Sequence, residues 1–91
     1  MPTISVRVEG IVQGVGYRAW TRTQATRLKL TGWVSNLSDG GVAITATGSP
    51  DALGDFTQRL WRGPANAMVK NVVITPHETE SSFASFEIRY T

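Results

Sequence analysis

A short glycine-rich segment is the part of the sequence best suited to chemistry. It consists of Gln13, Gly14, Val15, Gly16, Tyr17 and Arg18, between an expected strand and an expected helix. The first amides of a helix have no acceptor within the helix, and the helix dipole adds partial positive charge there. Glycines let consecutive amides turn inward as an anion-binding nest, and Arg18 adds a planar cation. We therefore predict that the amides from Gln13 to Tyr17 bind a phosphate group together with Arg18.

The same glycines allow other interpretations. They could simply make a tight turn, but an arginine at the positive end of a helix is unfavourable unless an anion joins it. The spacing Gly14-x-Gly16-x-x-Ala19 also matches the dinucleotide-binding fingerprint. A chain of 91 residues with an early hairpin cannot build the doubly wound sheet that this fingerprint needs. No Gly-Lys-Ser/Thr follows, which excludes a Walker A loop. Phosphate without a nucleotide fits best.

The composition narrows the reactions open to a bound phosphate. The chain has no Cys, which excludes a thiolate nucleophile, and it has one histidine, His77, which we expect to be solvated. Its acidic residues show no metal-ligand spacing, so we predict no metal and no cofactor. Water must then attack phosphorus directly, and the leaving group must depart unaided. A carboxylate, with an intrinsic pKa of about 4, can do so, which favours a carboxyl-phosphate anhydride as substrate.

Asn36 is the candidate to hold the attacking water. Its carboxamide both donates and accepts hydrogen bonds, so it can orient a nucleophile without changing charge. Taken alone, an Asn before Leu-Ser-Asp-Gly-Gly more often shapes a turn. The expected topology favours the catalytic role, because it places Asn36 beside the glycine-rich segment.

The elements that must position these residues follow from hydrophobic periodicity. Residues 4–9 alternate as a half-buried strand, and residues 32–36 and 42–48 are two strands joined by a turn at Asp39-Gly40-Gly41. Two more strands are expected near 69–75 and 86–90. A helix of about ten residues starts at Tyr17. Its expected buried residues are Tyr17, Trp20, Ala25 and Leu28. A second helix has Ser49 as N-cap and ends at Gly63-Pro64. Its expected buried residues are Leu53, Phe56, Leu60 and Trp61.

This order predicts one domain over residues 1–91 with a ferredoxin-like α+β sandwich fold. The plan is β-α-β-β-α-β plus a C-terminal strand, with two helices on one face of a mostly antiparallel sheet. Strands joined through a crossover helix run parallel, so the first two strands end at the same edge of the sheet. Residues 10–16 and Asn36 should therefore meet there.

Charge and hydropathy restrict the partners. The formal net charge is +2, and the basic residues are dispersed rather than gathered into a patch, so we expect no nucleic acid partner. No apolar run is long enough to span a membrane and no signal peptide is present, so we expect a cytoplasmic protein. The alternative is a non-catalytic anion- or RNA-binding module. An RNA-binding sheet would need aromatic residues on its central strands, and residues 4–9 and 42–48 carry none. We interpret Trp20, Trp33 and Trp61 as core residues.

Three separated segments resemble the small acylphosphatases over essentially the whole chain: residues 6–18, 30–40 and 85–90. The resemblance implies a metal-free hydrolase that cleaves acyl phosphates into a carboxylate and inorganic phosphate. It implies phosphate binding by Arg18 with the amides from Gln13 to Tyr17, and water orientation by Asn36. It further implies that a phosphate oxygen of the substrate takes the proton of the water. We expect the enzyme to be a monomer that phosphate inhibits.

A few positions depart from the common pattern of that family. Tyr17 stands where Phe is frequent, and Ile11 where a polar residue is frequent. Lys29 replaces a frequent glycine at the end of the first helix, which would strain the chain by about 1 kcal/mol if its φ is positive. The Thr91 carboxylate follows the last strand closely, and a pairing with Arg18 in the empty enzyme is a further hypothesis.

Overall fold

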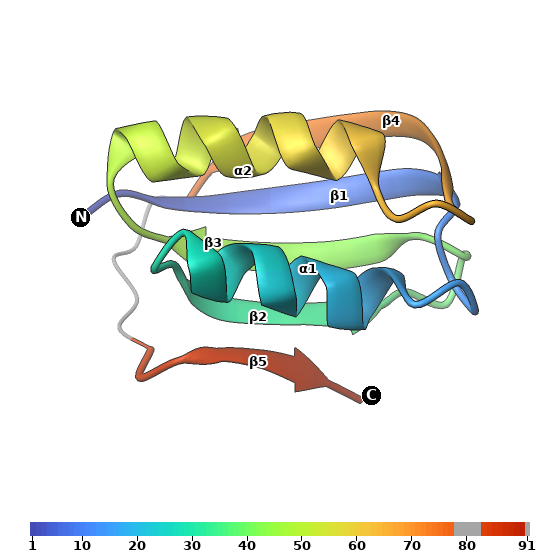
Figure 1. Cartoon of the computed structure of the whole chain (residues 1–91), viewed down its shortest axis with the longest axis horizontal. Helices are drawn as coiled ribbons and strands as arrows, with labels where there is room; N and C mark the ends of the chain where they lie inside the picture. Colours follow the sequence, from blue (N-terminus) through green and yellow to red (C-terminus); the bar gives the residue numbers. More distant parts are fainter. Residues whose placement is uncertain (78–82, 91) are drawn as a thin grey trace.

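Two helices cover one face of a five-stranded sheet (Figure 1). The computed structural model describes residues 1–77 and 83–90. The elements in chain order are β1 (Thr3–Ile11), α1 (Tyr17–Arg27), β2 (Thr31–Asn36), β3 (Val42–Thr47), α2 (Pro50–Arg62), β4 (Met68–Pro76) and β5 (Phe86–Arg89). The predicted order is confirmed. No helix in the described part of the chain is long and apolar enough to cross a membrane.

The sheet has the strand order β4-β1-β3-β2-β5. The pairs β1–β3, β1–β4 and β2–β3 are antiparallel, and β2–β5 is parallel. β3 therefore lies between β1 and β2, and Val42 of β3 is opposite Val8 on one side and Asn36 on the other. The first two strands thus end at the same edge of the sheet. The predicted ferredoxin-like α+β fold is confirmed.

The core lies between the sheet and the two helices. Strand alternation directs apolar side chains of the three central strands toward the helices. The apolar residues of each helix recur with the helical period and form a stripe that faces the sheet. The fully buried members include Val8, Val34, Val42, Ile44, Ala25, Phe56 and Leu60. The rings of Phe56 and Phe86 pack edge to face with centroids 6.1 Å apart, which joins α2 to β5.

The tryptophans correct the prediction that all three are core residues, because Trp20 packs against the core and Trp33 and Trp61 do not. Trp20 is half-buried against the core, and Trp33 is half-buried with the Arg89 guanidinium 5.0 Å from its ring centroid. Trp61, predicted to be buried, is 49% exposed. It follows Leu60 by one residue and is therefore rotated by about 100° around the helix. That rotation carries it out of the apolar stripe.

α2 begins and ends at the residues that the sequence predicts. The Ser49 hydroxyl accepts a hydrogen bond from the Ala52 amide at 3.2 Å, Pro50 occupies the first helical position, and Gly63 ends the helix with φ 66°. These signals are local, because each acts within a few residues of a helix end. They fix where α2 begins and ends relative to β3 and β4.

Candidate active site

The glycine-rich loop between β1 and α1 has the backbone of an anion-binding nest. Gly14 and Gly16 have φ 75° and 80°, and a Cβ at either position would meet no atom within 4 Å. Their backbone angles, rather than crowding, therefore require glycine. Within the described residues, no amide N–H from residue 13 to residue 17 donates to a protein acceptor, and the first turn of α1 contains no acidic residue. These amides are available for an anion.

Arg18 is the second residue of α1, directly after that loop. Its side chain is half-buried, and the guanidinium carbon lies 4.7 Å from the centroid of the Tyr90 ring. No carboxylate of the described residues forms an ion pair with it. The hypothesised pairing with Thr91 lies outside the described residues. Arg18 thus presents a cation at the positive end of a helix, where only an anionic ligand makes the charge favourable.

Asn36 is the last residue of β2 and lies on the helix-facing side of the sheet with Val34. Its Oδ1 atom is buried and accepts no hydrogen bond from any described residue. Leaving such an acceptor unpaired costs about 1–3 kcal/mol, and native proteins rarely do so away from functional sites. The free lone pair therefore points to a ligand or a bound water.

One pocket brings these groups together. Its volume is about 150 Å³. It is lined by Gly14, Gly16, Arg18 and Asn36, together with Val12, Tyr17, Ala19, Ile88 and Tyr90. Since a water molecule takes up about 30 Å³ in the liquid, the pocket has room for several small polar groups. Nest glycines, cation and carboxamide thus share one cavity, as the topology predicted.

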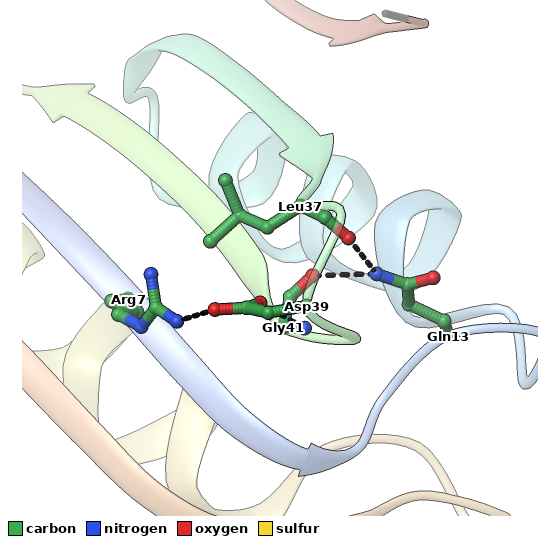
Figure 2. A network of polar contacts seen from close by, with 5 residues as sticks. All are labelled: Arg7, Gln13, Leu37, Asp39 and Gly41. Atoms are coloured by element: carbon green, nitrogen blue, oxygen red, sulfur yellow. Dashed lines mark hydrogen bonds and ion pairs between the residues drawn. The ribbon is translucent and has the colours of Figure 1, made fainter.

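The side chains of the other predicted loop residues point elsewhere. Gln13 donates from Nε2 to the carbonyls of Leu37 at 2.7 Å and Gly41 at 2.8 Å, so its side chain binds the β2–β3 turn (Figure 2). Val15 is half-buried and packs against the core. The Tyr17 phenol is buried and donates to the Leu60 carbonyl at 2.8 Å. Gln13 and Val15 can offer the pocket only their main-chain amides.

Sequence reasoning missed four residues of this pocket, which are Val12, Ala19, Ile88 and Tyr90. Ile88 and Tyr90 come from the C-terminal part of the chain, and Tyr90 is 77% exposed. The alternation of residues 86–90 puts Ile88 and Tyr90 on the same face as the buried Phe86. Nothing local showed that β5 would lie parallel to β2 and so reach the pocket.

A second, larger cavity lies on the outer side of the helices. It has a volume of about 560 Å³, and Trp20, Gln24 and Arg59 are among the residues that line it. The Arg59 guanidinium is already bound by the Asp55 carboxylate and by Gln24 Oε1. This cavity lacks the free amides and the unpaired acceptor of the smaller pocket. In the described ranges, no three His, Asp or Glu side chains cluster as metal ligands.

Comparisons with known proteins agree with this geometry. The sequence model of the family Acylphosphatase matches residues 4–88. An acylphosphatase of Alcanivorax borkumensis is 50% identical over 74 residues, covering 81% of this chain and 80% of its own. The crystal structure of the acylphosphatase from Bacillus subtilis superposes with a TM-score of 0.96 at 34% identity, over 99% of this chain and 100% of that one. The structure of an acylphosphatase from Coxiella burnetii gives 0.92 at 42% identity, over 97% and 92%. The chain therefore belongs to the acylphosphatase family, hydrolases that act on acid anhydrides.

Proposed function

We propose that the protein hydrolyses the carboxyl-phosphate bond of small acyl phosphates by direct attack of water, with Arg18 and Asn36 as the catalytic residues. The amides from Gln13 to Tyr17 and the Arg18 guanidinium bind the phosphoryl oxygens. Asn36 holds the water. The water oxygen forms a bond to phosphorus, the bond from phosphorus to the acyl oxygen breaks, and that oxygen leaves as a carboxylate. A phosphoryl oxygen takes the proton of the water.

The observation that carries this proposal is the unpaired Oδ1 of Asn36 in the pocket that Arg18 and the nest glycines also line. A water that donates one hydrogen to this oxygen turns a lone pair away from Asn36 and toward the remaining space of the pocket. Phosphorus bound by the loop amides occupies that space. Holding water and phosphorus in this alignment supplies most of what phosphoryl transfer needs from a protein.

The leaving group explains why this site can work without a general acid. A carboxylate is stable at neutral pH, since its conjugate acid has a pKa of about 4. The phosphoryl oxygens carry negative charge and can therefore accept the proton of the water. The remaining requirement is stabilisation of negative charge, which the helix terminus and the guanidinium provide.

Turnover of an aryl acyl phosphate in the presence of a chelator tests the proposal. Arg18→Ala should lose both turnover and competitive inhibition by phosphate, because it removes the cation of the binding site. Asn36→Ala should lower kcat by about 100-fold or more and keep phosphate inhibition, because it removes only the water-orienting group. Arg22→Ala, on the exposed side of α1, is the matched control and should behave as the parent. Full activity of either site variant would contradict the role assigned to that residue.

We further infer that the enzyme acts in the cytoplasm as a monomer and without nucleic acid. All groups assigned to the site come from one chain, so a second copy adds nothing to the reaction. The nine basic residues are spread along the sequence. On the open face of the sheet the Trp33 ring is covered by the Arg89 guanidinium, which leaves a poor platform for stacking bases.

A further inference from the structure

We propose that Gln13 is a positioning residue, whose side-chain amide holds the glycine-rich loop at the correct distance from Asn36. The inference rests on the proposed function, because it concerns the alignment of bound phosphate and water. It assigns the Gln13 side chain a role that is separate from phosphate binding by the Gln13 main-chain amide.

The Gln13 side chain bridges the two halves of the site. Its Nε2 uses both hydrogens, one toward the Leu37 carbonyl at 2.7 Å and one toward the Gly41 carbonyl at 2.8 Å (Figure 2). Gln13 directly precedes nest residue Gly14, and Leu37 directly follows Asn36. Each end of the bridge is thus one residue away from a group assigned to the reaction.

This bridge has no substitute in the described part of the chain. β1 and β2 are not neighbours, because β3 lies between them, so no strand pairing ties the two chain segments directly. The hydrogen bonds of Gln13 are the side-chain hydrogen bonds that join residues 12–18 to residues 36–41 among the residues described. The loop is therefore held against the turn by one side chain.

The β2–β3 turn, to which the Gln13 side chain binds, is itself held in place by hydrogen bonds and an ion pair. The Leu37 amide donates to the Gly41 carbonyl at 2.8 Å, and the Gly41 amide donates to Asp39 Oδ1 at 3.0 Å. Asp39 in turn pairs with Arg7 of β1 (Figure 2). Gly41 is buried, and a Cβ there would lie 3.0 Å from the Val8 carbonyl oxygen. Because the turn is fixed on β1, the hydrogen bonds of the Gln13 side chain set the distance between the turn and the loop at residue 13.

The geometry predicts which kinetic constant depends on Gln13. Phosphate contacts the loop amides and Arg18, which adjoin one another in the sequence, so these donors still surround the phosphate after a small shift of the loop. The water is held by Asn36 on the other side of the pocket, so the shift changes the distance and angle from water to phosphorus. Misplacement of reacting groups by about 1 Å can cost about 100-fold in rate. Loss of the bridge should therefore lower kcat and spare phosphate binding.

Two substitutions at this position test the proposal. Gln13→Met keeps the length of the side chain and removes both donors; we expect kcat to fall by about tenfold or more while the inhibition constant for phosphate changes less than about twofold. Gln13→Glu places a carboxylate against two carbonyl oxygens and should be slower still at pH 7. Its rate relative to the parent should rise as the pH falls toward 4, because the protonated carboxyl regains an O–H donor.

Gln24→Met is the matched control. It removes the acceptor of a 2.8 Å hydrogen bond from Arg59 on the outer side of the helices and should leave kcat at the parent value. Parent-like kcat in Gln13→Met, or an equal loss of phosphate affinity, would overturn the positioning role. Absence of turnover in the parent would instead contradict the proposed function. Backbone NMR order parameters of residues 14–16 would then decide, since they should be lower in Gln13→Met than in the parent, and unchanged order parameters overturn the proposal.

Discussion

Glycines of this protein serve two different physical needs. At Gly10 and Gly32 a Cβ would collide with the carbonyl oxygens of Met68 and Thr45 in neighbouring strands. These two glycines permit close approach of strands. Gly14 and Gly16 have open space around them and are needed only for their positive φ. That angle turns the loop amides inward, so substitutions here should damage phosphate binding as well as stability.

Gly16→Ala tests whether the positive φ at this position is needed for phosphate binding. Alanine at φ 80° costs about 1–2 kcal/mol, so the free energy of unfolding should fall by that amount. Phosphate affinity should fall too, because the amides relax away from the nest. Gly54→Ala is the matched control: it lies in α2, also with no atom within 4 Å of the added Cβ, and should stabilise the protein by up to about 1 kcal/mol. Denaturant unfolding and phosphate titration measure both effects, and unchanged phosphate affinity in Gly16→Ala would contradict the nest.

At the scale of the element, the two ends of α1 have different roles, since one is open for a ligand and the other is closed by hydrogen bonds within the chain. Its N-terminus lacks a side-chain cap and an acidic residue, so its amides and dipole are left for the substrate. Its C-terminus is closed by a Schellman motif, in which the Leu30 amide donates to Ala25 and the Lys29 amide donates to Thr26. Lys29 occupies the left-handed position of this motif with φ 60°, as anticipated from its place at the end of the helix.

Lys29→Gly should relieve this strain. A non-glycine residue at this angle costs about 1–2 kcal/mol, and the greater freedom of glycine in the unfolded chain offsets part of the gain. We expect a net increase in unfolding free energy of up to about 1 kcal/mol with unchanged kcat. Lys70→Gly, the same change at an exposed strand position, should destabilise the protein. A loss of stability in Lys29→Gly would show that the lysine side chain contributes more than its backbone angle costs.

At the scale of the whole molecule, the site depends on how α1 and α2 are joined to each other. The buried Tyr17 hydroxyl donates to the Leu60 carbonyl near the end of α2. In a helix the Leu60 carbonyl would accept a hydrogen bond from the amide four residues later. That residue is Pro64, which has no amide hydrogen to donate. Tyr17 therefore completes the last turn of α2 and anchors the first turn of α1, which carries Arg18. This gives a reason for Tyr at a position where the related family often has Phe.

Burial raises the pKa of the Tyr17 phenol above its ordinary value of 10. As the pH rises above about 10, the phenol ionises in the unfolded chain before it does so in the folded protein. The stability that Tyr17 contributes is thus fully present below pH 10 and is lost as the pH rises further. Tyr17→Phe should lower stability at neutral pH by about 1–3 kcal/mol and flatten its alkaline decline. Tyr90→Phe, at a ring that is 77% exposed, should retain the parental slope in unfolding measured from pH 8 to 11.

Local determinants could be predicted from sequence, because they act within a few residues. Strand alternation, the N-cap at Ser49, the glycines before Arg18 and the turn after Asn36 specified the element order. The parallel direction of strands joined by a crossover helix then placed Arg18 and Asn36 at the same edge of the sheet. Trp61 marks the limit of such reasoning, since a residue at the margin of an apolar stripe can face either way.

Only the tertiary structure decided the contacts that depend on distant partners. The order of strands brought β5 beside β2, and with it Ile88 and Tyr90 into the pocket. The same packing turned the Gln13 side chain toward two carbonyls of a turn more than twenty residues away and left Asn36 Oδ1 without a donor among the residues that the structure describes. Periodicity tells which face a residue occupies, but a hydrogen bond needs two groups placed to within a few tenths of an ångström, and only the packed chain sets that distance.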